Sequence, residues 1–304
     1  MKLRPYREED LPKLVDLWNE ARRGSYEFIP YTGEKLRKKL ERAASVLVAL
    51  DEQGKIAGFA LLRREWYGEE LLVLARPGGQ EIEPPTLSLG GEEQLLMAIE
   101  RRAQTDELTV VIDAEDRERI EFFTARGYQL GGSLYQMLIE LDLPRSMPPV
   151  PQGYHLRGLR PDEEEALIRV VNTAYDGERL RPGVLARWKE EDPAFSPEWV
   201  QVAEHEGQLV AAAVARTDRE FNLHYHAKRG YLGPAATLPD HRGRGLNRAL
   251  TVRVLNLLQE QGLEQASLYT WSGNRTALRV LKGLSFRISH RWRLLTKSSK
   301  AGRR

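Results

Sequence analysis

The sequence predicts a soluble protein of mixed α/β class (an α+β mixed sheet), built from two tandem domains. The 304 residues are too many for one small hydrophobic core. Near the middle, four prolines fall within the eleven residues 143–153. The segments on either side follow the same order of elements, with strands first and a strand–helix–strand unit later, which favours a partly parallel sheet.

Composition excludes several classes of protein. The chain is 41% apolar and 30% charged, which is typical of a globular protein. No apolar run approaches the roughly 18 residues of a membrane span, and the start MKLRPYREEDL lacks the apolar core of a secretory signal. Without cysteine there is no disulfide, thiolate nucleophile or cysteine metal site. We therefore expect a cytoplasmic protein with no metal and no membrane partner.

The charge is distributed unevenly along the chain. Residues 1–143 carry 20 Lys+Arg against 27 Asp+Glu, a net charge of −7, and residues 144–304 carry 26 against 17, a net of +9. A basic half attracts anionic ligands. Its arginines are scattered and no nucleic-acid-binding signature is present, so nucleic acid is not the expected partner.

The two halves read as a duplication. We place one domain at 1–143, a proline-rich extended linker at 144–152 and a second domain at 153–304. The ends of the halves also match, as 114–130 and 270–288. At a constant offset of 153, six residues of the first half have identical counterparts in the second: Leu3, Arg4, Arg7, Leu14, Asn19 and Ala21 match Leu156, Arg157, Arg160, Leu167, Asn172 and Ala174.

The second half divides into elements in order. A short strand and an amphipathic helix start it, and 199–218 reads as a hairpin around His205-Glu206-Gly207. A strand follows at about 230–238, and a helix at 246–258, whose residues Leu246, Leu250, Val254, Leu257 and Leu258 share one face.

Arg242-Gly243-Arg244-Gly245 lies between that strand and that helix. Helix N-termini leave backbone N–H groups unpaired, and glycines allow a close approach, so the stretch suits a pyrophosphate. An ordinary strand-to-helix turn is the alternative. The missing GxxxxGK[ST] disfavours a P-loop, and the missing third glycine of GxGxxG, at Arg248, disfavours a dinucleotide-binding fold.

The region 231–288 resembles the GCN5-related N-acetyltransferase (GNAT) superfamily. In its motif [QR]-x-x-G-x-[GA], Arg242 and Gly245 match, whereas Asn247 replaces Gly or Ala. A second block, Asn274-x-x-Ala277 to Ser285-Phe286, also matches. The resemblance implies two tandem GNAT domains. It also implies a sheet bulge at Gly233-Pro234; a strand that simply begins later is the alternative.

The resemblance implies acetyl-CoA as the cosubstrate. Backbone groups of Ala236, Thr237 and Leu238 would pair with the pantetheine arm. Asn274 would contact the arm, or cap the next helix, and the two roles are compatible. The pyrophosphate would lie on the amides of Arg242, Gly243, Arg244, Gly245, Leu246 and Asn247.

The implied activity is direct transfer of an acetyl group to a primary amine of a small molecule or peptide. Leu281 occupies the position of the family's usual tyrosine acid, so the thiolate leaves unassisted or a hydroxyl such as that of Tyr269 substitutes. The candidates for the base are Glu204, His224, His226 and Tyr231. The two histidines would share a face if their segment is a strand.

The first half resembles a degenerate copy. Its segment 79–91 lacks the motif, and Glu81 and Glu83 would repel phosphate. Asp116 and Phe123 stand at the asparagine and tyrosine positions. We expect this half to bind no cofactor and to shape the acceptor cleft. A non-catalytic acyl-CoA sensor or scaffold of the same fold is the alternative function, and a homodimer stays open.

Overall fold

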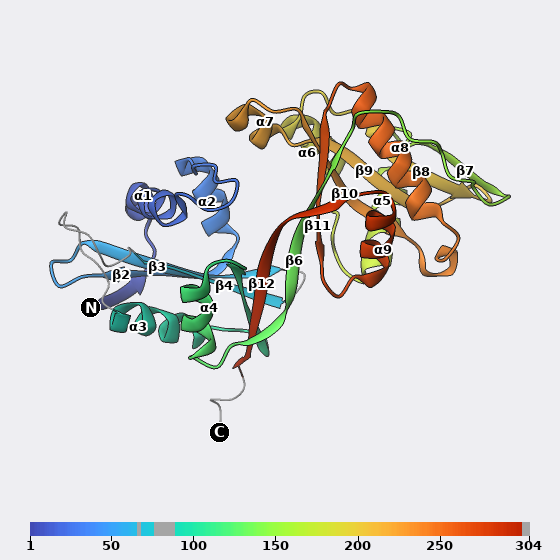
Figure 1. Ribbon diagram of the computed structural model, residues 1–304. Helices are drawn as coiled ribbons and strands as arrows, with labels where there is room; N and C mark the ends of the chain where they lie inside the picture. Colours follow the sequence, from blue (N-terminus) through green and yellow to red (C-terminus); the bar gives the residue numbers. More distant parts are fainter. Residues whose placement is uncertain (66–67, 76–88, 300–304) are drawn as a thin grey trace. The chain divides into compact units, whose positions relative to one another are not determined.

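The computed structural model describes residues 1–65, 68–75 and 89–299, and the chain divides into two compact units (Figure 1). Unit 1 is Met1–Leu134 with the segment that starts at Arg291, and unit 2 is Tyr135–His290. The predicted mixed α/β class is confirmed by the alternation of strands and helices in both units. Glu81, Glu83 and most of the segment 79–91 lie outside the described residues.

In unit 1 the strands follow the order β1-β2-β3-β4-β5-β12, in which β12 (Arg287–Ser298) is the last described strand of the chain. Alternate strand residues face opposite sides, so the sheet has two apolar faces. One face packs on α1 and α2 through residues such as Leu14 and Phe59, and the other packs on α3 and α4 through Leu62 and Leu95. The elements are β1 (Lys2–Pro5), η1 (Glu8–Asp10), α1 (Leu11–Arg22), α2 (Gly33–Glu41), β2 (Ala43–Leu50), β3 (Ile56–Glu65), β4 (Gly68–Ala75), α3 (Leu89–Glu100), β5 (Glu107–Asp113), α4 (Arg117–Thr124) and β6 (Gln129–Glu140).

In unit 2 the strands follow the order β6-β11-β10-β9-β8-β7. The predicted hairpin is confirmed: β8 and β9 pair up to His205↔Gln208, and Glu206 and Gly207 turn with φ of 50° and 75°. The elements are β7 (Tyr154–Gly158), α5 (Glu164–Tyr175), α6 (Val184–Glu191), η2 (Pro197–Trp199), β8 (Val200–His205), β9 (Gln208–Thr217), α7 (Arg219–Tyr225), β10 (Arg229–Thr237), η3 (Pro239–His241), α8 (Leu246–Glu260), β11 (Gln265–Trp271), α9 (Arg275–Gly283) and β12 (Arg287–Ser298).

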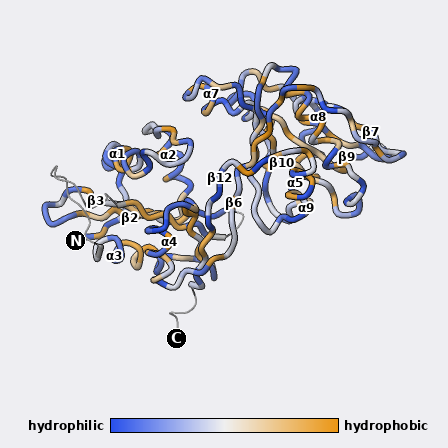
Figure 2. Tube along the Cα trace, viewed as in Figure 1, coloured by the Kyte–Doolittle hydropathy of each residue, from blue (hydrophilic) through white to orange (hydrophobic). Residues whose placement is uncertain are grey.

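The core of unit 2 lies between its sheet and its helices. Figure 2 shows the apolar residues gathered along β9, β10 and α8. The predicted apolar face of 246–258 is confirmed, because Leu250, Val254 and Leu258 are fully buried in this core. Gly230 is required here, since a Cβ on it would lie 2.8 Å from the Leu258 side chain.

Two strands pass between the units. β6 begins in unit 1 and ends in unit 2, whereas β12 begins in unit 2 and ends in unit 1. There β12 pairs antiparallel with β5, from Trp292↔Asp113 to Ser298↔Glu107, and buries Leu295 in the core of unit 1. The compact units therefore differ from the predicted contiguous ranges 1–143 and 153–304, because the part of β12 from Arg291 onward belongs to unit 1.

The predicted linker has no helix or strand between β6 and β7. It is held by α8: the backbone N–H of Arg145 donates to Asn256 Oδ1 and its carbonyl accepts from Asn256 Nδ2, both at 2.8 Å. The segment thus packs along unit 2.

The duplication is visible in matching hydrogen bonds. Arg4 binds Asp10 through two bonds of 2.7 Å, and Arg157 binds Glu163 in the same way. The side-chain amide of Asn19 binds the backbone N–H and carbonyl of Tyr31, and that of Asn172 binds those of Leu180. Each equivalent pair joins the same elements of its unit, so the sequence repeat is a structural repeat.

Replacing Asn172 by alanine is expected to lower the free energy of unfolding by about 1–3 kcal/mol. The change leaves the backbone N–H groups of Arg179 and Leu180 and the Leu180 carbonyl without their side-chain partner. Urea unfolding of Asn172→Ala measures the loss. Thr173→Ala, at the next and exposed position of α5, is the control. Equal losses in both variants would contradict the role of the amide.

Candidate functional site

The parallel strands β10 and β11 separate partway along their length. They pair from Arg229↔Gln265 to Tyr231↔Ser267, and within the described residues no pair follows. On its other side β10 stays paired with β9 as far as Thr237↔Ala211. We call the opening beyond Tyr231 and Ser267 the fork. It leaves one edge of β10 available for hydrogen bonds with an extended ligand.

A bulge bends β10 at the fork. The pairing with β9 shifts between Leu232 and Ala235, which confirms the irregularity predicted at Gly233-Pro234. Gly233 has a φ of 145°, a backbone conformation that residues other than glycine rarely adopt. Proline at the next position removes a ladder donor, so the bulge is built into the sequence.

The backbone direction decides which residues of β10 face the fork. The N–H of Leu238 donates to Val210 O at 2.9 Å, so Leu238 and, by alternation, Ala236 direct their groups to β9. Thr237 and Ala235 direct theirs to the fork, where their carbonyls accept from Arg242 Nε at 3.1 Å and from the Tyr175 hydroxyl at 3.1 Å. Sequence reasoning therefore missed Ala235, because register is needed to assign the sides.

The loop Arg242–Gly245, here called the glycine loop, joins the end of η3 to α8. Gly243 and Gly245 have φ values of 76° and 79°, and a Cβ on either would meet no atom within 4 Å. Residues with a side chain rarely adopt such a positive φ, which explains why both positions are glycine. The space beside both glycines is open. Gly245 is the N-cap of α8 and provides no side-chain bond, and the first turn holds no acidic residue. The backbone N–H groups in the first turn of α8, which include those of Leu246 and Asn247, therefore donate to no capping side chain at Gly245.

The arginines of the glycine loop brace it. Arg242 Nη2 donates to Ala174 O at 2.9 Å, so its guanidinium links the end of β10 to the end of α5. Arg244 lies 5.9 Å from the Tyr154 ring, whose hydroxyl lies 2.9 Å from His241 Nδ1. Both arginines are exposed and keep positive charge beside the amides, which favours an anion such as a pyrophosphate.

The structure brings two tyrosines together at the fork. The rings of Tyr231 and Tyr269 lie 6.3 Å apart, on residues that share one face of β10 and β11. The Tyr269 hydroxyl accepts a hydrogen bond from Gln136 Nε2 at 3.3 Å, and its side chain is 46% exposed. Tyr269 thus lies where a ligand in the fork can reach it.

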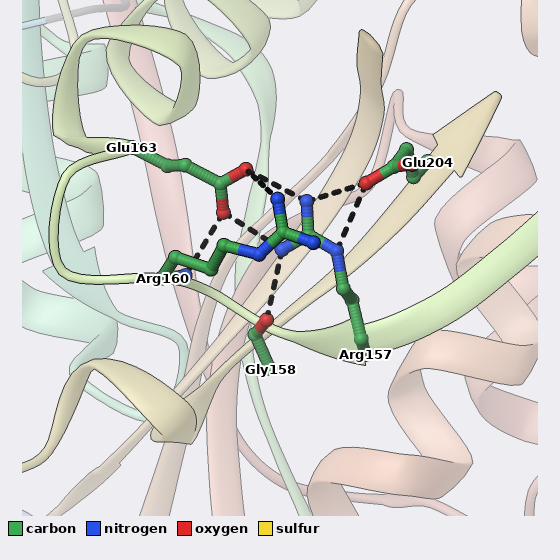
Figure 3. A network of polar contacts seen from close by, with 5 residues as sticks. All are labelled: Arg157, Gly158, Arg160, Glu163 and Glu204. Carbon is green, nitrogen blue, oxygen red and sulfur yellow. Dashed lines mark hydrogen bonds and ion pairs between the residues drawn. The ribbon is translucent and has the colours of Figure 1, made fainter. Parts of the chain in front are cut away.

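Glu204 is part of an ion-pair network on β7, β8 and the turn before α5 (Figure 3). Its carboxylate accepts hydrogen bonds from Arg157 Nε at 3.0 Å and Nη2 at 2.6 Å. Arg157 also binds Glu163, and these partners hold its pKa above the ordinary value. The carboxylate of Glu204 is therefore engaged by a permanent cation.

The histidine pair does not lie on a strand. Residues 219–225 form helix α7, and His226 follows it with a φ of 51°, so the expectation of a shared strand face is wrong. Asn222 closes the helix onto β10 by binding the backbone N–H and carbonyl of Arg229, each at 2.8 Å. His224 and His226 are both exposed. The prediction rested on the alternation of His224, Tyr225 and His226, and three residues are too few to distinguish a strand from this short helix.

Asn274 is the N-cap of α9, and Leu281 lies within that helix. Asn274 Oδ1 accepts from the N–H of Ala277 at 3.1 Å, so the capping role is observed, and contact with a cofactor stays a prediction. Leu281 is 6% exposed and packs in the core of unit 2. Unit 1 has the same cap, with Asp116 accepting from Arg119 N at 3.0 Å, and buries Phe123.

A cavity of about 490 Å³ lies elsewhere in unit 2, lined by residues of β7, η2, β8 and α8 that include Arg157, Gln201 and Arg253. None of the sequence-predicted site residues lines it. In the described ranges no three His, Asp or Glu side chains gather as metal ligands. No described helix is both long and apolar enough to span a membrane.

Comparisons with known proteins agree on one family. Residues 164–286 match the model described as "Acetyltransferase (GNAT) family". The mycothiol acetyltransferase of Streptomyces coelicolor is 31% identical over 161 residues, which are 52% of this chain and 49% of that relative. The mycothiol acetyltransferase of Streptomyces bingchenggensis is 26% identical over 285 residues, 91% of this chain and 88% of that protein. The chain thus spans about half the length of several curated relatives that it matches. It spans most of the length of others.

Solved structures show the same fold over both units. A GCN5-related N-acetyltransferase from Sphaerobacter thermophilus has a TM-score of 0.66 at 19% identity, covering 98% of this chain and 95% of its own. A tandem GNAT protein from the clavulanic acid biosynthesis pathway has a TM-score of 0.64 at 18% identity and covers 98% of both chains. The predicted tandem fold is confirmed.

Proposed function

We propose that this chain, whose residues 164–286 match the acetyltransferase (GNAT) family model, is an acetyl-CoA-dependent N-acetyltransferase whose second unit carries out the transfer. The observation that supports this most directly is the fork, which ends at the glycine loop and the N-terminus of α8. A ligand with an extended polar arm and a pyrophosphate fits a free strand edge followed by uncapped amides.

The residues present fit such a cosubstrate. Thr237 and Ala235 direct backbone groups toward the arm, although each carbonyl already has one side-chain partner. A carbonyl oxygen can accept a second bond, and a backbone N–H needs an acceptor of the kind an amide arm supplies. The amides from Gly243 to Asn247 would hold the pyrophosphate, whereas the predicted Arg242 amide already donates to Pro239 O at 3.2 Å. Asn274 would lie beside the arm.

The chemistry that acetyl-CoA supplies is an activated thioester carbonyl. The protein then has to place a neutral amine beside that carbonyl, support the developing oxyanion and manage two protons. Glu204, His224, His226 and Tyr269 remain the proposed proton-transfer residues. Among them, Tyr269 has the location at the fork that direct contact requires.

For the acceptor we propose a primary amine on a small molecule or peptide. The names of the relatives put a mycothiol-type amine first among the acceptors to test. The N-terminal unit is proposed to bind no cofactor and to shape the acceptor side.

A non-catalytic acyl-CoA-binding protein is the second candidate function. Leu281 favours it, because its buried side chain cannot donate a proton. Asn247 favours it too, since a larger residue replaces Gly or Ala in the motif.

Calorimetry with acetyl-CoA and CoA, followed by a thiol-release assay over a panel of amines, separates the candidates. We expect binding of both ligands and thiol release with at least one amine. Binding without release on any acceptor would favour the sensor or scaffold, and no binding would contradict both.

A further inference from the structure

Tyr231 lies at the deepest point of the fork. It is the last residue of β10 that pairs with β11. Its phenol points along the strand toward Gly233 of the bulge. A Cβ on Gly233 would lie 3.5 Å from Tyr231 Cε1 and 3.7 Å from its hydroxyl oxygen. An arm whose pyrophosphate rests on the glycine loop and whose chain follows β10 would end at this place.

The ring of Tyr231 is fixed by its neighbours. Arg216, directly opposite on β9, places its guanidinium 5.3 Å from the Tyr231 ring and 5.5 Å from the Trp188 ring. A cation between two aromatic faces restrains both rings. The contact favours the observed orientation of the Tyr231 ring, with its hydroxyl beside Gly233.

The hydroxyl of Tyr231 is available as a donor. Within the described residues it has no hydrogen-bond partner, whereas the Tyr175 hydroxyl already donates to Ala235 O. A half-buried hydroxyl without a protein partner is explained if a ligand atom is its acceptor.

The protonation state favours an acid over a base. Burial raises the pKa of Tyr231, and the nearby charge of Arg216 lowers that pKa by less. The phenol therefore stays protonated at neutral pH, and it has a proton to give.

We propose that the Tyr231 hydroxyl donates the proton that the sulfur of CoA takes as it leaves, an inference that rests on the proposed function. The amine nitrogen forms a bond to the acetyl carbon, and the bond between that carbon and sulfur breaks. The electron pair stays on sulfur, which takes the proton of Tyr231. The tyrosinate regains a proton from solvent, which has received the one that the amine nitrogen loses.

Tyr231 on β10 would take the role of the tyrosine acid that the family usually has at the position of Leu281 on α9. Leu281 on α9 is buried and has no acidic proton, so a donor has to come from elsewhere around the fork. Tyr269 is the competing hydroxyl, and it is exposed and already accepts from Gln136.

The test titrates the thiol of CoA bound to the full chain, followed by thiolate absorbance in the ultraviolet. A hydroxyl that donates to sulfur stabilises the thiolate and lowers the pKa of the bound thiol. In Tyr231→Phe, which keeps the ring and its contact with Arg216, we expect that pKa to rise by about one unit, a tenfold change in the ionisation constant.

Tyr269→Phe is titrated in parallel. A rise in Tyr269→Phe but not in Tyr231→Phe would overturn the assignment, as would an unchanged thiol pKa in Tyr231→Phe. Either result leaves the proposed function standing, because CoA is still bound. Failure of the wild-type chain to bind CoA would overturn both.

Once an amine acceptor is identified, the rate of acetyl transfer gives a second measure of the role of Tyr231. We expect the kcat of Tyr231→Phe to fall about 100-fold while the KM for acetyl-CoA changes little. Acetyl thioesters of more acidic thiols should narrow that gap, because their leaving groups need less help. A loss of rate that is the same for every thiol would indicate a structural role and contradict the assignment.

Discussion

Glutamate in place of Gly245 is expected to weaken the binding of acetyl-CoA by about 100-fold or more. The space beside Gly245 is open, so the new side chain can be accommodated, but its carboxylate would lie beside the amides proposed to hold the pyrophosphate. Repulsion between the anions and loss of the amide contacts both act against binding. Calorimetry with acetyl-CoA measures the effect.

Two further variants separate charge from backbone strain. Gly245→Ala keeps the strain of a positive φ without adding charge. Gly262→Glu adds the same charge just beyond the other end of α8, at a φ of 77° and with equally open space. We expect both controls to bind within a few-fold of the wild type. A similar loss in Gly262→Glu, or wild-type affinity in Gly245→Glu, would move the pyrophosphate away from the glycine loop.

Replacing Arg157 by methionine is expected to cost about 2–3 kcal/mol of unfolding free energy. The guanidinium serves two carboxylates at once, and all three side chains are 17–23% exposed (Figure 3). Removing it leaves Glu163 and Glu204 as partly buried anions without their shared cation. The partial exposure keeps the cost below that of a fully buried pair.

The loss should depend on pH in a defined direction. The hydrogen bonds from Arg157 hold the pKa of Glu163 below its usual range. A folded-state pKa below the unfolded value of about 4.3 gives stability that is present above that value and is lost as pH falls through the folded pKa. The difference in stability between the wild type and Arg157→Met should therefore shrink on acidification below about pH 4.

Arg160→Met is the matched control for this prediction. Arg160 is 63% exposed and lies 3.8 Å from Glu163, so it contributes little. Denaturant unfolding of both variants from neutral to acid pH provides the comparison. Equal losses, or a difference that grows in acid, would contradict the role of the network.

Much of the molecule follows from local sequence. Leu250, Val254 and Leu258 recur at helical spacing because one side of α8 must be apolar, and all three are buried. The repeat at an offset of 153 reappears in each unit as an arginine–carboxylate pair and as an asparagine side chain that binds a backbone N–H of a nearby loop. The sequence placed a glycine-rich turn between a strand and a helix here, and Gly245 has a φ of 79° directly before α8.

Other features depend on contacts between distant residues. Strand β12 begins in unit 2, and its pairing with β5, a strand far away in the sequence, places its second part in unit 1. His224 lies on a helix because Asn222 binds the backbone of Arg229, an interaction that strand alternation does not reveal.

The sequence by itself determined the duplicated mixed α/β fold and the glycine loop, because periodicity and backbone conformation are properties of neighbouring residues. Only the tertiary structure decided where β10 leaves β11, which backbone groups face the fork and that Tyr231 lies at its deepest point. Those features depend on the register of strands that are far apart in the chain, and register is fixed by packing over the whole sheet.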